Sequence, residues 1–355
     1  MRPDVDTDRR PLVLVWEVTQ ACDLTCEHCR ADAQPQRHPD ELTTAEGQRL
    51  LDAAARFDDE QLVVLSGGDP LVRDDLVHLV DYGTDRGLRM TLTPSGTRSL
   101  TDERIAALEG AGLRRMALSF DGASAATHDA FRGEDGSFES TVRAARAASE
   151  LGVPLQVNTT VCAATVDELP AIRELVVDLG AVLWSVFFLV PVGRGATLDP
   201  VTPERAESVM EWLQTVSEDA PFAVKTTEAP HFRRVGAQRG AGGPRGGGIT
   251  AGDGFAFVSH VGEVYPSGFL PEPAGDVRED DLVELYREAP LFERLRDPDR
   301  LRGKCGTCSF RGLCGGSRSR AYAVTGDPLA SDPLCAHVPP AYDGPLPERQ
   351  RGETA

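Results

Sequence analysis

The sequence is short of basic residues and has no long apolar segment. Its 37 Lys and Arg are outnumbered by 56 Asp and Glu, which gives a net charge of −19. So acidic a surface disfavours nonspecific nucleic-acid binding, which needs basic patches. Composition alone leaves open whether the acidity serves solubility or reflects a halophilic source. No run of about 18 apolar residues occurs, and segment 1–10 lacks the apolar core of a signal peptide. We therefore expect a cytoplasmic protein without a membrane span.

Disulfides are rare in the cytoplasm, so clustered cysteines there are better interpreted as metal ligands. The chain has eight cysteines, and seven of them fall into two groups. The exception is Cys162, which we expect to be a buried apolar side chain. The two groups are Cys22, Cys26 and Cys29 near one end of the chain, and Cys305, Cys308, Cys314 and Cys335 near the other.

Apolar segments alternate with helical patterns over the first 220 residues. This alternation is typical of an α/β fold in which helices cover a parallel sheet. A hairpin is expected over 255–265 and a helix over 282–288. We expect a tail at 1–11, a core at 12–220, a connecting segment with a glycine-rich loop at 221–254, a second domain at 255–338 and a tail at 339–355. Six core strands are expected, at 13–19, 62–66, 88–93, 115–120, 155–161 and 183–190.

The first cysteine group has the spacing C-x3-C-x2-C and follows the first expected strand directly. It therefore lies at the carboxyl end of a parallel sheet, where active sites gather. Three thiolates can hold three irons of a cubane cluster and leave the fourth iron open. The alternative is zinc, but three close cysteines without a fourth make a poor tetrahedral structural site.

The stretch CDLTCEHC resembles the signature of the radical S-adenosylmethionine (SAM) superfamily, although an aromatic residue is common where His28 stands. The resemblance implies a partial (βα)6 TIM-like barrel and a [4Fe–4S] cluster on Cys22, Cys26 and Cys29. It also implies reductive cleavage of SAM to a 5′-deoxyadenosyl radical that abstracts hydrogen from a substrate. An electron donor such as ferredoxin or flavodoxin would then be required.

Further segments match the SAM pocket of that family. Gly67 and Gly68 allow close backbone approach to a ligand, and Asp69 stands where the family usually has Glu. Ser119 resembles a family contact to SAM, and Arg132 has the planar fork that suits a carboxylate. Asn158 is a candidate for contact with the ribose or the substrate.

The second cysteine group reads C-x2-C-x5-C, with a fourth cysteine further on. Four thiolates would saturate a second [4Fe–4S] cluster or a zinc ion. The stretch GKCGTCSFRGLCGG resembles the cluster-binding SPASM extension of radical SAM enzymes, and more narrowly its haem-biosynthesis branch. Members of that branch often carry further cysteines where Ser267 and Ser317 stand here.

The resemblance implies decarboxylation or deacetylation of a tetrapyrrole side chain in haem biosynthesis. Two alternatives remain open: a radical SAM maturase that modifies a peptide, and a non-catalytic scaffold stabilised by metal. His231 is a weaker candidate for acid–base chemistry or iron ligation. Four arginines are candidates for binding substrate carboxylates, with balance of the acidic surface as the competing role: Arg233, Arg234, Arg318 and Arg320.

Overall fold

The computed structural model describes residues 6–58, 60–240 and 249–347. The centre of the expected glycine-rich loop, at 241–248, and the outer parts of both expected tails lie outside these ranges. Within them, no helix is long and apolar enough to cross a membrane.

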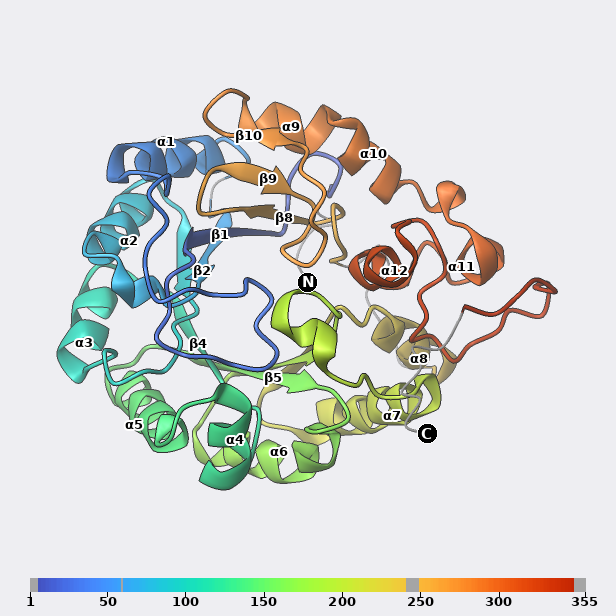
Figure 1. Cartoon of the computed structure of the whole chain (residues 1–355), viewed down its shortest axis with the longest axis horizontal. Helices are drawn as coiled ribbons and strands as arrows, with labels where there is room; N and C mark the ends of the chain where they lie inside the picture. Colours follow the sequence, from blue (N-terminus) through green and yellow to red (C-terminus); the bar gives the residue numbers. More distant parts are fainter. Residues whose placement is uncertain (1–5, 59, 241–248, 348–355) are drawn as a thin grey trace.

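One mixed sheet of ten strands organises the described residues, in the order β10-β9-β8-β1-β2-β3-β4-β5-β6-β7. Strands β1 to β8 are paired in parallel, whereas β9 and β10 are antiparallel to their neighbours. The sheet curls into an open barrel, as Figure 1 shows. The strands are β1 (Val13–Thr19), β2 (Leu62–Gly67), β3 (Arg89–Leu92), β4 (Arg115–Ser119), β5 (Leu155–Val161), β6 (Leu183–Phe188), β7 (Ala223–Thr227), β8 (Phe255–Val258), β9 (Glu263–Tyr265) and β10 (Gly275–Asp276).

Helices surround the outer face of this sheet (Figure 1). Sequence signals start several of them: Thr43 forms a capping box with Glu46 before α1, and Thr202 caps α7, which has Pro203 in its first turn. Such caps satisfy backbone N–H groups that the helix itself leaves unpaired. The helices are α1 (Thr44–Ala55), α2 (Leu76–Asp85), α3 (Asp102–Gly110), α4 (Ala125–Arg132), α5 (Ser137–Glu150), α6 (Leu169–Asp178), α7 (Pro203–Asp219) and α8 (His231–Gln238).

The two faces of the curled sheet differ in character. Side chains such as Trp16, Leu118 and Trp184 are fully buried between the strands and the helices. Because side chains alternate along a strand, their neighbours point into the barrel, where Ala117 and Asn158 line a central cavity. Helix packing therefore holds the barrel, and the inner face is left to form a site.

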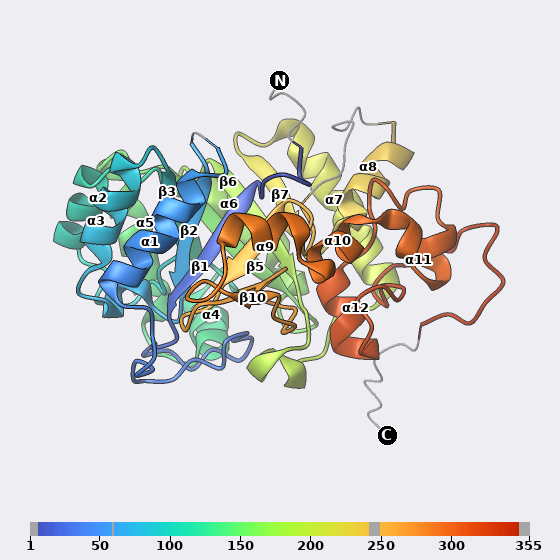
Figure 2. The ribbon, with the colours of Figure 1, turned by 90° about the horizontal axis from the view of Figure 1, so that it is seen from above.

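The C-terminal part continues the barrel and then leaves it. Strand β8 extends the sheet beside β1, and the expected hairpin is present as β8 and β9. Of the remaining helices, α9 packs beside α1, whereas α11 and α12 lie at one end of the molecule near α7 and α8 (Figures 1 and 2). These remaining helices are α9 (Leu282–Glu288), α10 (Pro290–Arg296), α11 (Gly303–Thr307) and α12 (Arg318–Thr325).

The parallel sheet contains more strands than the six expected. The segment Ala223–Thr227 was expected to be connecting chain but forms β7. It is an edge strand, short and only half-buried, so it lacks the apolar run that marked the others. Residues 125–132, for which the sequence predicted no helix, form α4, which Ser124 caps through its side chain.

Candidate functional site

The loop after β1 brings the first three cysteines together. Cys22, Cys26 and Cys29 are all free thiols, and all three line a cavity of about 340 Å³. Two sulfurs receive backbone N–H groups: Leu24 N–H donates to Cys22 Sγ and Ala33 N–H to Cys29 Sγ, each at 3.4 Å. Burial raises the pKa of Cys22 and Cys26. Metal binding here would therefore release protons, as thiolate ligation requires.

Gly67 and Gly68 hold the base of this cysteine loop. Gly68 N–H donates to Thr19 O at 2.9 Å, and the next N–H, from Asp69, donates to Ala21 O at 2.7 Å. A Cβ on Gly67 would lie 2.2 Å from Thr19 O, and one on Gly68 would lie 2.2 Å from Ala21 O. Any larger residue would force the two segments apart. Both glycines line the cavity.

Asp69 is buried beside the cavity but is not one of its lining residues. Its carboxylate accepts hydrogen bonds from Leu71 N–H at 3.1 Å and from the Thr97 hydroxyl at 2.9 Å. Burial raises its pKa. Since these protein groups already bind the side chain, Asp69 shapes the turn after β2, and a ligand contact from this motif would come from the backbone.

The other expected SAM-pocket residues converge on the cavity. Pairing of β4 with β5 places Ser119 directly opposite Asn158, and both line the cavity. Arg132, at the end of α4, also lines it and is buried. Its Nη2 donates to Ser95 O at 3.1 Å, and the Ser95 hydroxyl lies 3.4 Å from Cys22 Sγ. A guanidinium thus stands immediately beside the cysteine loop.

The His28 ring lines the same cavity and presents a flat, uncharged surface to it. Its ring stacks on Phe131, with centroids 4.6 Å apart and planes 8° from parallel. Burial lowers its pKa to about 4, although Asp121, 3.8 Å away, opposes the shift. The imidazole is therefore neutral near pH 7 and offers the planar surface that an aromatic residue would offer.

The second cysteine group also comes together, away from the first. Cys305, Cys308, Cys314 and Cys335 line a small separate cavity together with His231. Within residues 6–58, 60–240 and 249–347, no three His, Cys, Asp or Glu side chains are arranged to hold a single metal ion.

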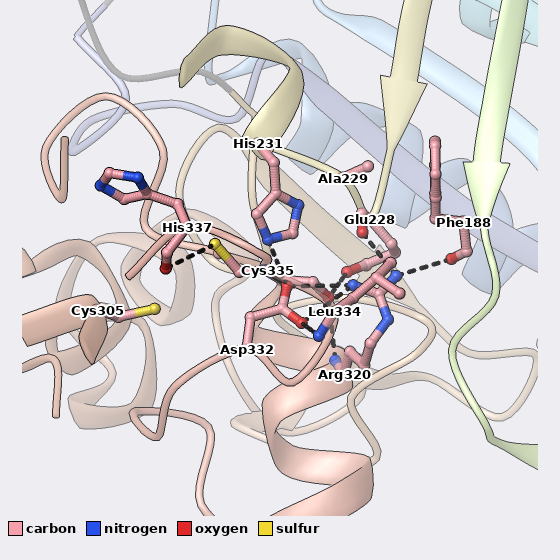
Figure 3. Close-up of polar contacts among 12 residues, drawn as sticks. Phe188, Glu228, Ala229, His231, Cys305, Arg320, Asp332, Leu334, Cys335 and His337 are labelled. Atoms are coloured by element: carbon pink, nitrogen blue, oxygen red, sulfur yellow. Dashed lines mark hydrogen bonds and ion pairs between the residues drawn. The ribbon is translucent and has the colours of Figure 1, made fainter. Parts of the chain in front are cut away.

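A buried ion cluster joins this second group to the barrel (Figure 3). Asp332 lies 3.2 Å from His231 Nε2 and 3.1 Å from Arg320 Nη1, and it accepts the N–H groups of Ser317 and Leu334. Burial lowers the pKa of His231, but Asp332 and Cys335 outweigh burial and raise it to about 10. The imidazole therefore stays charged, as the partner of a buried carboxylate.

Arg320 connects this buried ion cluster to the barrel strands. Its guanidinium donates to the carbonyls of Phe188 and Leu189 at 3.0 Å each and to Glu228 O at 2.8 Å (Figure 3). These carbonyls lie just at the ends of β6 and β7. The second cysteine group is thereby fixed to the same rim of the barrel as the cavity.

None of the four arginines named as candidates for binding substrate carboxylates lines the large cavity. Arg233 donates to Leu313 O, Arg234 pairs with Glu207, Arg318 donates to the carbonyls of Pro328 and Ala330, and Arg320 pairs with Asp332. His231 likewise lies at the second cysteine group. These side chains bind backbone and carboxylate groups within the protein.

Several charged residues of the large cavity were not expected from the sequence, and Lys225 and Glu228 are two of them. Lys225 lines it from β7, where alternation with the core-packed Val224 was the available signal. Glu228, at φ +53°, accepts hydrogen bonds from the hydroxyls of Ser267, Ser317 and Ser319. Ser267 and Ser317, the positions for which the resemblance implies cysteine in many relatives, bind a carboxylate here.

Comparison with known proteins agrees with this geometry. Residues 16–176 match the radical SAM superfamily. The chain is 40% identical to the AdoMet-dependent heme synthase of Methanosarcina barkeri, covering 93% of this chain and 97% of that one. It is 37% identical to the AdoMet-dependent heme synthase of Nitratidesulfovibrio vulgaris, over 92% of each chain.

A solved structure supports the fold. Streptococcus suis SuiB bound to S-adenosylmethionine superposes with a TM-score of 0.73 over 93% of this chain and 78% of its own, at 16% identity. At that identity the likeness concerns the fold alone. The fold, the three-cysteine loop beside the cavity and the full-length similarity lead to one conclusion: the chain belongs to the radical SAM superfamily and resembles its haem-biosynthesis branch.

Proposed function

We propose that this radical SAM enzyme removes carboxyl groups from the propionate side chains of an iron tetrapyrrole in haem synthesis. The similarity to AdoMet-dependent heme synthases, which extends over nearly the whole of both chains, carries this proposal. Didecarboxysiroheme is the alternative substrate within the same branch, and there an acetate fragment would leave.

The residues around the cavity fit the two cofactors of the family. Cys22, Cys26 and Cys29 supply three thiolates from one loop and leave one iron without a protein ligand. The cluster and SAM, when bound, supply the radical that takes a hydrogen atom from the substrate. Arg132 would pair with a carboxylate beside the cysteine loop, and its buried position strengthens such a pair.

Ser119, Asn158 and the Gly67–Gly68 backbone would hold the remaining polar groups of SAM at the carboxyl ends of β2, β4 and β5. His28 would present its neutral ring to a planar group of the ligand. These side chains orient the ligand and exclude water, which favours reaction by fixed proximity.

The overall change needs an electron acceptor. A propionate that becomes a vinyl group loses one hydrogen atom, one carbon dioxide and one electron. We assign the second cysteine group to an auxiliary [4Fe–4S] cluster that passes or accepts an electron, since its four thiols line one small cavity and four thiolates would saturate such a cluster. A ferredoxin or flavodoxin would serve as the external donor.

Anaerobic reconstitution followed by mass spectrometry tests the proposal. The chain should bind about eight irons, form 5′-deoxyadenosine with SAM and dithionite, and convert Fe-coproporphyrin III to a product lighter by two carbon dioxide molecules and four hydrogen atoms. About four irons with active SAM cleavage would contradict the auxiliary cluster. Cleavage of SAM without conversion of either tetrapyrrole would contradict the substrate assignment and favour a peptide substrate.

A further inference from the structure

Lys225 stands out among the charged residues of the large cavity. It is one of only two lysines in the chain, the other being Lys304. It projects inward from β7 between Val224, which packs on the core, and Thr226. Among the described residues its ammonium has no hydrogen-bond or ion-pair partner. Burial lowers its pKa to about 8, so the fold keeps a cation where solvation is poor.

Three arginines that line the same cavity differ from Lys225, because each of them pairs with a carboxylate of the protein. Arg30 pairs with Glu17, Arg132 with Asp121 and Arg194 with Asp32. Glu228, the carboxylate among the described lining residues, is bound by serine hydroxyls. An acidic chain of net charge −19 thus gathers cations around one cavity, which marks that cavity as a site for an anion.

Lys225 lies toward the end of the cavity remote from the cysteines. Arg115, whose charge acts on Lys225, is the first residue of β4, whereas Ser119 is the last. At about 3.3 Å per residue, these two positions are about 13 Å apart along the strand. A ligand that reaches both the cysteine loop and Lys225 must therefore be extended.

The walls between these two ends suit a largely apolar body. Strands β8, β1 and β2 contribute a hydrophobic side, whereas β4 and β5 contribute amide and hydroxyl groups. The apolar lining residues of this part are Val13, Val15, Leu62, Val64, Phe255 and Phe257, and the polar ones are Gln156 and Asn158. Such a cavity fits an amphipathic molecule with an anionic group at its far end.

We propose that Lys225 binds a non-reacting carboxylate of the substrate at the end of the cavity away from the cysteine loop. The inference rests on the proposed function, because a tetrapyrrole with several propionates offers one carboxylate as an anchor while another side chain faces the cysteines. Lys225 is then a specificity-determining residue: it fixes which edge of the macrocycle reaches the reactive end.

The test compares Lys225→Met with Lys225→Arg in the reconstituted, SAM-bound enzyme. Met keeps the length of the side chain without charge, and Arg restores the charge. We expect Lys225→Met to weaken Fe-coproporphyrin III binding, followed by its Soret absorbance, by roughly 10- to 100-fold, the loss typical of a hydrogen bond to a charged group. Lys225→Arg should recover most of the affinity. Equal iron content and unaltered SAM binding would show that both variants are intact.

Equal affinity of wild type and Lys225→Met, with wild type still converting the tetrapyrrole, would overturn this inference but leave the proposed function standing. A wild type that binds no tetrapyrrole would overturn the proposed function instead. In that case, acylation of the two lysines, measured by mass spectrometry with and without millimolar glutarate, tests whether an anion binds at Lys225. Protection of Lys225 but not of Lys304 would support it, and equal labelling would refute it.

Discussion

Replacing Asp332 by Asn should destabilise the C-terminal part of the enzyme strongly. The carboxylate is fully buried and is the shared partner of Arg320 and His231. Removing one member of a buried ion pair typically costs about 3–5 kcal/mol, because the other charge stays buried without compensation. His231 can lose its proton, but a guanidinium cannot. We therefore expect a loss near the lower end, about 3 kcal/mol.

The assay is urea unfolding of the anaerobically reconstituted enzyme, with Asp299→Asn as the matched control. Asp299 makes the same type of pair, with Arg311, but on the surface, where such pairs contribute about 0–1 kcal/mol. A loss of stability in Asp332→Asn that does not exceed the loss in Asp299→Asn would refute the reasoning. The outcome would then mean that the ion cluster of Figure 3 is hydrated in solution.

The pH dependence of this difference has a definite sign. The pKa of His231 is raised from 6.5 to about 10 in the fold, so its contribution is fully present below pH 6.5 and disappears as the pH rises toward 10. Asn cannot hold the imidazolium in this way. The stability gap between wild type and Asp332→Asn should therefore narrow between about pH 7 and pH 10 but not close, because Arg320 stays charged throughout.

Four other changes separate the roles of the two cysteine groups and the cavity. Cys26→Ser should lose about four irons and all 5′-deoxyadenosine formation, measured by iron analysis and chromatography. Cys308→Ser should also lose about four irons but retain SAM cleavage in the absence of substrate. His28→Phe should keep SAM binding within a few-fold by equilibrium dialysis, because His28 is neutral and stacked, whereas charge-dependent binding would show as a larger loss. Lys225→Met should raise the free energy of unfolding at pH 7 by about 1–3 kcal/mol. The pKa of Lys225 is lowered to about 8, which means that the charged amine opposes folding below that pH. The gain in stability should vanish by about pH 10.5, and a gain that does not depend on pH would contradict this cause.

The barrel was predictable because its strands are apolar on both faces or end in glycine and cysteine motifs. Val13–Thr19 and Leu183–Phe188 are mostly apolar, and helices and neighbouring strands cover them. The strand at Ala223–Thr227 escaped prediction for the opposite reason. As an edge strand that lines the cavity, it carries Lys225 and three threonine or alanine side chains in place of an apolar run.

Some residues of the candidate site were also predictable from the sequence, and others were not. The spacing of Cys22, Cys26 and Cys29 needs only a local loop, so sequence alone placed them together. The role of Arg320 depends on contacts with residues more than a hundred positions away, at Phe188 and Leu189, and no local pattern signals them. The sequence pointed to arginines that bind carboxylates of a substrate, whereas in the structure Arg234 and Arg320 pair with carboxylates of the protein and Arg233 and Arg318 bind backbone carbonyls.

Charge compensation links the two cysteine groups physically. A cluster held by several thiolates places negative charge in a poorly solvated position, and the fold must supply cations nearby. Arg132 lies beside the first group, while Arg318 donates to Cys305 Sγ at 3.8 Å and His231 lies at the second. Buried cations are costly unless paired, so these side chains make the metal-bound state better compensated than the metal-free one. Although the chain has a large excess of acidic residues, its buried cations are therefore concentrated where metal clusters and anionic ligands would bind.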